Sequence, residues 1–380
     1  MARLIPLLFL FLFACGEGLP EVDSTAWEDT FLQDSIPLEI VKEYELLYAT
    51  GFKIERIEGN HLVTVYDDSI QIAQYLLHKN KAPKSVPGVQ NIKIPLTSIA
   101  CLSTTYLPFI DRIGEITTVN GVANAQFVRN KSIRKQIENK TTANISASEE
   151  INLEQVLEID PEVLMVYPFN SPDYSRLEDM GIQLFYNTEY KEAHPLGQAE
   201  WIKLFGLLYN KEAEAFGIFE TITRSYNSTL EIAKNAAPVR VMAGSIFNEL
   251  WSAPGGNSMG VKLFEDAGGK FIWKDDRTGS YTKDLEVVIE DSEQADVMVL
   301  ISSYQGKFTT EALLEENPKY RLMKPFTDEH VIHCNTANVN YFEDALLEPD
   351  IIIKDLVHLF HRELLPDHKL KYFWHVKPRP

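Results

Sequence analysis

The chain has 380 residues and a formal net charge of −19, with 45% hydrophobic and 24% charged residues. This composition is typical of a globular protein, and the length is sufficient for two domains, each with its own core. The excess of acidic residues argues against a nucleic-acid partner, because such partners are bound by basic surfaces.

The first residues predict where the protein is sent. Arg3 precedes an apolar stretch over residues 4–13, which is too short to cross a bilayer because a crossing needs about 20 residues. Small residues flank Cys15 directly after this stretch, and the whole resembles a bacterial lipoprotein signal that is cleaved before a lipid-bearing cysteine. We therefore expect residues 1–15 to be the signal with its lipidated Cys15. The mature protein is then periplasmic and lipid-anchored to a bacterial membrane.

Two segments precede the main fold. Residues 16–40 are acidic and show no periodicity, which favours a tether. Residues 41–91 form a small β-rich addition, because strand-like runs flank a turn signal at 58–60 and a further strand-like run follows over 69–77.

Alternating strand and helix signals then predict a first α/β lobe over 92–210. We expect strands over 92–100 and 116–119, with a helix over 106–113 between them. A helix that starts at Asn152 leads through a proline break into a strand over 163–167. This order with short loops predicts a parallel sheet.

A long helix follows over 211–237, with Asn210 as its N-cap and Pro238 as its stop. Beyond it the alternation of strands and helices restarts, so residues 238–380 form a second α/β lobe that ends in a helix and a tail. The predicted fold class is therefore α/β, with two Rossmann-like lobes joined by one long spanning helix. The spacing of Cys101 and Cys334 leaves open whether they form a disulfide or stay free thiols.

Four segments carry a resemblance to a known family. They are NLEQVLEIDPEVLMV, HPLGQAEWIKLFGLLYNKEAEAFGIFETI, WSAPGGNSMGVKLFEDAGGKFIW and LEPDIIIKDLVHLFHRELLPDH. In this order, behind a lipobox, they resemble the solute-binding lipoproteins of ABC importers for vitamin B12 and for iron–siderophore or haem complexes. The resemblance covers residues 92–368 and implies two lobes joined by a rigid helix.

The resemblance also implies a role for two carboxylates. Each lobe of such proteins exposes a glutamate that pairs with arginines of the permease, and the matching positions here are Glu154 and Glu286. Paired donors of arginine bind a carboxylate in a fixed orientation, which suits docking. The ordinary alternative is that both are solvated helix residues.

The ligand is expected in the cleft between the lobes, lined by residues just past the strand ends. The expected lining residues are mainly aromatic, hydroxyl or amide side chains: Thr104, Thr105, Tyr106, Tyr167, Phe169, Asn170, Phe247, Asn248, Trp251, Ser280, Tyr281, Tyr341 and Phe342. Such a set suits a large, partly apolar ligand. The absence of an arginine cluster makes a citrate-type siderophore less favoured than a neutral or catecholate one.

The resulting prediction is a monomeric binding component of an ABC importer, with an iron–siderophore or a related metal chelate or corrinoid as cargo. Cobalamin or haem is the alternative cargo, and a secreted α/β enzyme or a receptor without a permease is the alternative class. The histidines show no metal-ligand spacing, and no P-loop, nucleophile elbow or dinucleotide fingerprint is present. We therefore expect neither catalysis nor a metal site nor a bound cofactor.

Overall fold

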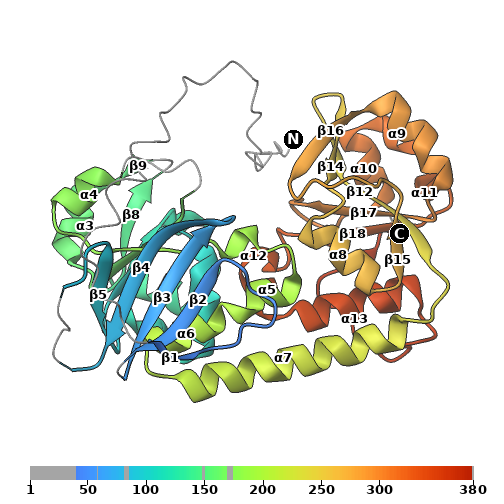
Figure 1. The fold of residues 1–380 in the computed structure, drawn as a ribbon. Coiled ribbons are helices and arrows are strands. Elements are labelled where there is room, and N and C mark those ends of the chain that lie inside the picture. The colour runs from blue at the N-terminus through green and yellow to red at the C-terminus, as the bar shows by residue number, and fades with distance from the viewer. Residues whose placement is uncertain (1–39, 58, 81–84, 148–149, 169–173, 379–380) are drawn as a thin grey trace, which may run out of the picture. The chain divides into compact units, whose positions relative to one another are not determined.

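A computed structural model describes residues 40–57, 59–80, 85–147, 150–168 and 174–378 (Figure 1). The predicted signal with Cys15, nearly all of the tether, and Phe169 and Asn170 lie outside the described residues. The chain divides into two compact units. Of the described residues, the N-terminal unit contains those up to Lys191 together with Glu200–Phe216, and the C-terminal unit contains Glu192–Ala199 and those from Gly217 onward.

The N-terminal unit begins with a five-stranded sheet in the order β1-β2-β3-β4-β5, seen as the blue ribbons of Figure 1. Neighbouring strands are antiparallel except β4 and β5, which are parallel. The strands are β1 Ile40–Glu43, β2 Phe52–Ile57, β3 Asn60–Asp67, β4 Ile70–His78 and β5 Val89–Lys93. The expected β-rich addition and its hairpin are therefore confirmed.

This sheet packs tightly on the rest of the N-terminal unit. The ring of Tyr75 stacks on Phe185 with 4.1 Å between centroids, and its hydroxyl accepts the backbone N–H of Tyr186 at 2.9 Å. The side-chain amide of Gln183 donates to the carbonyl of Asn91 at 3.1 Å. Because Tyr75 and Phe185 are both fully buried, the addition shares a core with the α/β part of this unit.

The α/β part of the N-terminal unit is built on a six-stranded sheet in the order β11-β10-β6-β7-β8-β9. All neighbours are parallel except β8 and β9. The strands are β6 Ile99–Cys101, β7 Val119–Ala123, β8 Ala143–Ala147, β9 Glu150–Ile151, β10 Val163–Val166 and β11 Leu184–Tyr186. The helices are α1 Leu107–Arg112, α2 Lys131–Glu138, α3 Leu153–Ile159, α4 Ser175–Asp179 and α6 Ile202–Leu208, while α5 Pro195–Glu200 begins in the C-terminal unit.

Two expected strands are wrong in this region. The expected strand 92–100 is split, because Pro95 cannot donate a backbone hydrogen bond; Ile92 instead pairs with Leu77 in the first sheet, and β6 starts at Ile99. The expected strand 116–119 is a turn of 3₁₀-helix over Ile116–Thr118 followed by β7. The carbonyl of Glu115 accepts both the N–H and the hydroxyl of Thr118, and these bonds close the chain into a turn despite its β-branched residues.

The C-terminal unit repeats the parallel plan with a sheet in the order β15-β12-β17-β18-β19, where only β19 is antiparallel to its neighbour. Its strands are β12 Val239–Ala243, β15 Gly269–Phe271, β17 Val297–Ser302, β18 Val331–Asn335 and β19 Trp374–His375. A separate antiparallel sheet contains β13 Ser245–Phe247, β14 Leu250–Pro254 and β16 Ser280–Asp284. The helices are α8 Met259–Asp266, α9 Leu285–Asp291, α10 Thr310–Glu316, α11 Lys324–Thr327, α12 Tyr341–Asp344 and α13 Pro349–Phe360.

The predicted long helix is α7, Glu212–Ala233. It starts in the N-terminal unit and continues from Gly217 in the C-terminal unit. There the hydroxyl of Tyr226 donates to Asp266 of α8 at 2.7 Å, and the ammonium of Lys354 of α13 donates to the hydroxyl of Ser225 at 2.6 Å. The predicted α/β fold class is thus confirmed, whereas the exact limits proposed for the domains stay a prediction.

A buried carboxylate fixes the chain between β1 and β2. Glu200 has no exposed surface, and its oxygens accept the backbone N–H groups of Leu47, Tyr48 and Ala49 at 2.8–3.0 Å. The ammonium of Lys203, which is itself 5% exposed, donates to the same carboxylate at 2.5 Å. The segment therefore has its backbone donors satisfied by a charged acceptor instead of a strand partner.

Two further findings concern the cysteines and the possibility of a membrane-spanning helix. Cys101 and Cys334 are separate buried thiols, and burial raises the pKa of each. No helix among the described residues combines the length and the apolar character needed to span a membrane.

Candidate functional site

The parallel strands of the N-terminal unit end at one edge of their sheet, where ligands of α/β proteins bind. Thr104 and Thr105 lie in a 3₁₀ turn after β6, and the hydroxyl of Ser103 caps this turn by accepting the N–H of Thr105 at 3.2 Å. Tyr167 directly follows β10. The three predicted residues Thr104, Thr105 and Tyr167 are each partly exposed at this edge.

A polar link joins the ends of β6 and β11. The hydroxyl of Thr105 donates to Glu189 at 2.5 Å, and the N–H of Glu189 donates to the side chain of Asn187 at 2.9 Å. Asn187 is fully buried, and its own N–H donates to the carbonyl of Val166 at the end of β10. The turn after β11 is therefore fixed to the ends of β10 and β6, and it holds the buried carboxylate of Glu189 at the edge.

Four tyrosines lie on the segments next to this link, namely Tyr106, Tyr167, Tyr174 and Tyr186. The hydroxyl of Tyr174 donates to the carbonyl of Tyr167 at 3.1 Å, and the ring of Tyr174 meets that of Tyr186 edge to face. Tyr106 is 0% exposed, and its hydroxyl has no hydrogen-bond partner in the part of the chain that the structure describes. Burial, followed by the charge of Glu189, raises its pKa well above the ordinary value. The expectation that Tyr106 lines a ligand surface is therefore not compatible with its burial.

In the C-terminal unit, Asn335 ends β18 at the carboxyl edge of the parallel sheet and binds the chain that follows β17. Its side-chain oxygen accepts the N–H of Tyr304 at 3.0 Å, and its amide donates to the carbonyl of Tyr304 at 2.9 Å. The same edge contains a hydrogen bond of 2.9 Å between Ser302 and His333, with the ring of Phe308 stacked on the imidazole. Burial lowers the pKa of His333 to about 3, so the imidazole is neutral at physiological pH.

The three-stranded sheet of the C-terminal unit presents two different faces. Directly opposed residues of antiparallel strands share a face, and the register pairs Phe247 with Leu250 and Trp251 with Lys283. Trp251 is 0% exposed and its indole N–H donates to the carbonyl of Ala243, so its face is the core. Phe247 is on the other face and is 46% exposed. The expectation that Trp251 lines a ligand surface is therefore not compatible with its burial.

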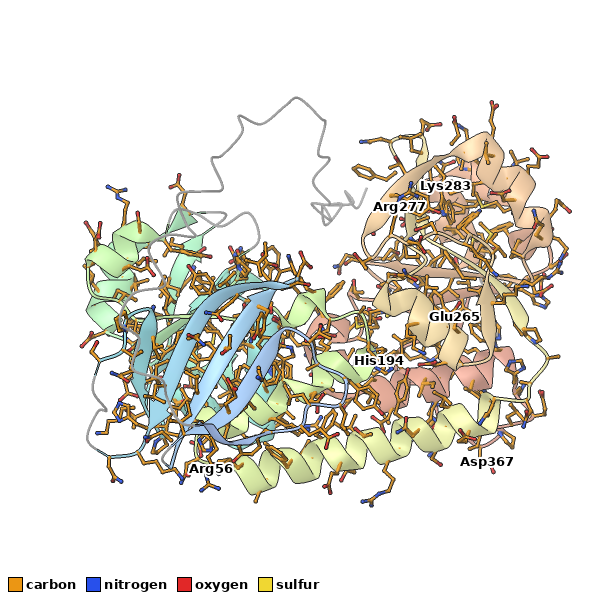
Figure 2. All side chains as sticks on the ribbon, in the orientation of Figure 1. Arg56, His194, Glu265, Arg277, Lys283 and Asp367 are labelled. Atoms are coloured by element: carbon orange, nitrogen blue, oxygen red, sulfur yellow. The ribbon has the colours of Figure 1, made fainter. Side chains whose placement is uncertain are left out.

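Neighbouring residues of β16 also divide between the two faces. Ser280 is opposite Pro254 and exposed, whereas Tyr281 is opposite the buried Ala253. The guanidinium of Arg277, which is labelled in Figure 2, lies 4.3 Å from the centroid of the Tyr281 ring. Burial and the nearby charge of Asp275 raise the pKa of Tyr281 to about 12. Ser280 therefore belongs with Phe247, and Tyr281 belongs with the packed face.

The other predicted residues of this unit lie in the β13–β14 hairpin and at the start of α12. Asn248 is at the tip of the β13–β14 hairpin with a φ of +47°, a conformation that asparagine tolerates. Tyr341 and Phe342 begin α12 and lie 5.5 Å apart between ring centroids. Phe342 is 42% exposed, whereas Tyr341 also meets Tyr372 edge to face.

The edges also contain residues that the sequence analysis did not select, namely Asn187, Glu189, Tyr304 and Asn335. Asn187 and Glu189 follow β11, Tyr304 follows β17, and Asn335 ends β18. The rule that ligand residues follow strand ends would have found them, had it been applied to every strand.

Glu154 and Glu286 occupy matching places in the two units. Each is exposed and belongs to the first turn of a helix that follows a strand, α3 for Glu154 and α9 for Glu286. A carboxylate in the first turn is favoured by the unpaired N–H groups there. The structure thus makes both carboxylates accessible to a partner.

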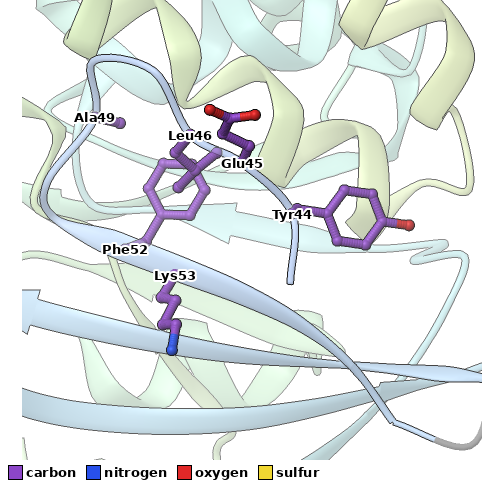
Figure 3. Close-up of a pocket in the computed structure, with 6 residues that line it drawn as sticks. All are labelled: Tyr44, Glu45, Leu46, Ala49, Phe52 and Lys53. Carbon is purple, nitrogen blue, oxygen red and sulfur yellow. The ribbon is translucent and has the colours of Figure 1, made fainter. Parts of the chain in front are cut away.

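A cavity of about 450 Å³ lies elsewhere, on the first sheet of the N-terminal unit (Figure 3). It is lined by Tyr44, Glu45, Leu46, Ala49, Phe52 and Lys53, none of which was predicted to bind a ligand. The described residues contain no cluster of three or more histidine, cysteine or acidic side chains arranged to hold a metal ion.

Comparisons with known proteins agree with this arrangement. Residues 99–337 match the family described as periplasmic binding protein. An uncharacterized lipoprotein of Methanocaldococcus jannaschii is 30% identical over 294 residues, which cover 74% of this chain and 69% of the relative.

Solved structures show the same fold. A periplasmic heme binding protein from Pseudomonas aeruginosa has a TM-score of 0.57 and 15% identity, covering 75% of this chain and 99% of that one. The TroA-like periplasmic binding protein FepB from Veillonella parvula has a TM-score of 0.56 and 17% identity, covering 74% and 95%. The periplasmic vitamin B12 binding protein BtuF of Vibrio cholerae has a TM-score of 0.52 and 12% identity, covering 72% and 99%. On the family match over residues 99–337, with which the shared fold agrees, this chain belongs to the periplasmic binding protein family.

Proposed function

We propose that this protein is the substrate-binding component of an ABC importer. Its ligand is an iron–siderophore or a related metal chelate or corrinoid, and it delivers this ligand to a permease through Glu154 and Glu286. A lipid on Cys15 holds the mature chain at the membrane on its periplasmic side. Family membership supports the transport role, and the lipoprotein relative in M. jannaschii supports the anchor.

The observation that carries the proposal is the chemistry of the carboxyl edges. In the N-terminal unit Tyr174 contacts both Tyr167 and Tyr186, and in the C-terminal unit Phe247 and Phe342 are exposed. Aromatic rings with scattered hydroxyl and amide groups suit a large, flat, partly apolar ligand, because the rings stack and the polar groups fix its orientation. The protein binds this ligand without transforming it.

Titration of a soluble form of the chain that lacks residues 1–15 tests the proposal. The probes are haemin, cyanocobalamin and ferric complexes of catecholate and hydroxamate siderophores. Binding is measured by tryptophan fluorescence, and calorimetry verifies that a change in fluorescence does not come from light absorption by the probe. We expect one probe to bind with a dissociation constant of about 1 μM or less. Failure of every probe to bind would overturn the proposed ligand class.

A variant locates the binding within the protein. We expect Phe247→Ala to weaken binding of that probe about three- to tenfold, because the exposed ring loses its stacking contact with the ligand. The matched control is Leu322→Ala, since Leu322 is 55% exposed in the same unit but was not predicted to bind ligand. Equal effects of the two variants would exclude Phe247 from the site.

A further inference from the structure

The turn between β3 and β4 extends to the ligand edge of the N-terminal unit. The hydroxyl of Thr188 donates to the carbonyl of Tyr66 at 2.9 Å, and the ammonium of Lys191 pairs with both Asp67 and Asp68. Thr188 and Lys191 follow β11, which ends at Tyr186, so they lie at the carboxyl end of the parallel sheet. The β-rich addition thus contacts the segment that carries Glu189.

This contact is built into the fold. Thr188 is 1% exposed, and the side chains of Lys191 and Asp67 are each 28% exposed, so the hydrogen bond and the ion pair are partly shielded from water. Burial opposes the charge on Lys191, but the hydrogen bonds to Asp67 and Asp68 prevail and raise its pKa. A half-buried pair with these bonds fixes the turn more firmly than an exposed pair would.

The turn presents an apolar side chain beside the edge. Ile70 is 70% exposed and is paired across the turn with Asp67. Tyr190, which immediately precedes Lys191, is 39% exposed. The ion pair between Lys191 and Asp67 therefore brings together two segments that each expose a large apolar residue. Single exposed apolar residues are common, but two on segments fixed to one ligand edge indicate a contact surface.

The same surface continues into the candidate site. Glu189 lies between Thr188 and Tyr190 and accepts the hydroxyl of Thr105 at 2.5 Å. The turn residues 67–70 and the segment 188–191 together contain three carboxylates, Asp67, Asp68 and Glu189, and one cation, Lys191. This excess of negative charge disfavours a ligand that itself carries many carboxylates.

We propose that the β3–β4 turn forms one wall of the ligand site, with Ile70 and Tyr190 as specificity-determining contacts. The inference rests on the proposed function and deepens it. The wall selects a metal chelate or corrinoid with an apolar or aromatic periphery and little negative charge. The β-rich addition is thereby part of ligand recognition as well as of the core.

A fluorescent label tests the wall directly. In the form that lacks residues 1–15 the cysteines are Cys101 and Cys334, which are 1% and 0% exposed with raised pKa values, so a thiol introduced by Ile70→Cys is labelled selectively. The control is Met180→Cys, because Met180 is 41% exposed in the same unit but follows α4, before β11 begins. We expect the probe that binds the unmodified chain to shift the emission of the label at position 70 and to leave that at position 180 unchanged.

Affinity provides the second readout. We expect Ile70→Ser to weaken binding of the same probe about tenfold, because an apolar contact with the ligand is lost, and Met180→Ser to leave it unchanged. Circular dichroism verifies that both variants are folded. If the unmodified chain binds a probe while the label and the affinity do not respond, the wall is excluded and the proposed function stands. If no probe binds the unmodified chain, the proposed ligand class fails and this inference fails with it.

Discussion

Replacement of Glu200 by alanine is expected to lower the free energy of unfolding by about 3–5 kcal/mol, the range for removal of one partner from a buried ion pair. Glu200 is 0% exposed and is the acceptor for Lys203 and for three consecutive backbone N–H groups. Without the carboxylate, a buried ammonium has lost its partner and the N–H groups have lost their acceptor. A buried group without a partner raises the free energy of the folded state, whereas the same group in the unfolded chain is hydrogen-bonded to water.

Urea unfolding, followed by fluorescence and circular dichroism, measures this loss. Glu231→Ala is the matched control, because Glu231 of α7 pairs with Lys234 just after the helix and both side chains are at least 60% exposed. Its removal is expected to cost about 0.5 kcal/mol or less. The double variant Glu200→Gln with Lys203→Met is expected to recover part of the stability, since glutamine still accepts N–H groups and the unpaired cation is gone. A loss below about 1 kcal/mol in Glu200→Ala would show that the site relaxes and lets water in.

Asp355 plays the same part in the C-terminal unit. It is 0% exposed on α13 and accepts the backbone N–H groups of Lys371, Tyr372 and Phe373, together with a contact of 2.6 Å from His368. In both units a helix carboxylate thus binds consecutive N–H groups of a segment that lies outside the parallel sheet. The chain has 55 acidic residues, and no local pattern separates these two from the rest, so the sequence could not reveal them.

The parts of the fold that could be predicted are those with strong local causes. Pro349 opens α13, the helix expected near the end of the second lobe, and the side chain of Asn152 caps α3 by accepting the N–H of Gln155. The apolar runs of β10 and β18 are buried strands. The errors at 92–100 and 116–119 arose where tertiary pairing of Ile92 or a local cap at Thr118 overrode the strand preference of the residues.

The candidate site was predictable only as far as strand ends could be located. Thr105 follows β6 and Phe247 ends β13, as residues beyond the ends of parallel strands, but the sequence did not show which face of a strand is buried. Trp251 illustrates the difficulty, because its neighbour across the strands and its hydrogen bond to Ala243 place it in the core. The link from Glu189 to Thr105 joins residues 84 positions apart, and such a contact follows from topology instead of local sequence.

The second large effect concerns transport. We expect the double variant Glu154→Ala with Glu286→Ala to abolish ligand uptake while leaving the affinity for the ligand unchanged. Both carboxylates are exposed and belong to first helical turns, so their removal leaves the core of each unit intact. Truncation of a carboxylate that is paired with arginine in a buried contact costs about 2 kcal/mol or more, which weakens docking about 30-fold for each glutamate.

Uptake of labelled ligand in cells that carry the permease, together with titration of the purified variant, separates docking from binding. The control double variant, Glu138→Ala with Glu231→Ala, removes the same charge from exposed helical positions, one in each unit. We expect it to transport normally, because a general loss of negative charge does not replace two fixed contacts. Each single variant should retain part of the uptake, since one arginine–carboxylate contact still orients the protein on the permease. Undiminished uptake by the Glu154/Glu286 double variant would exclude docking through these carboxylates. Normal ligand affinity in that variant would then assign the permease contact to other residues.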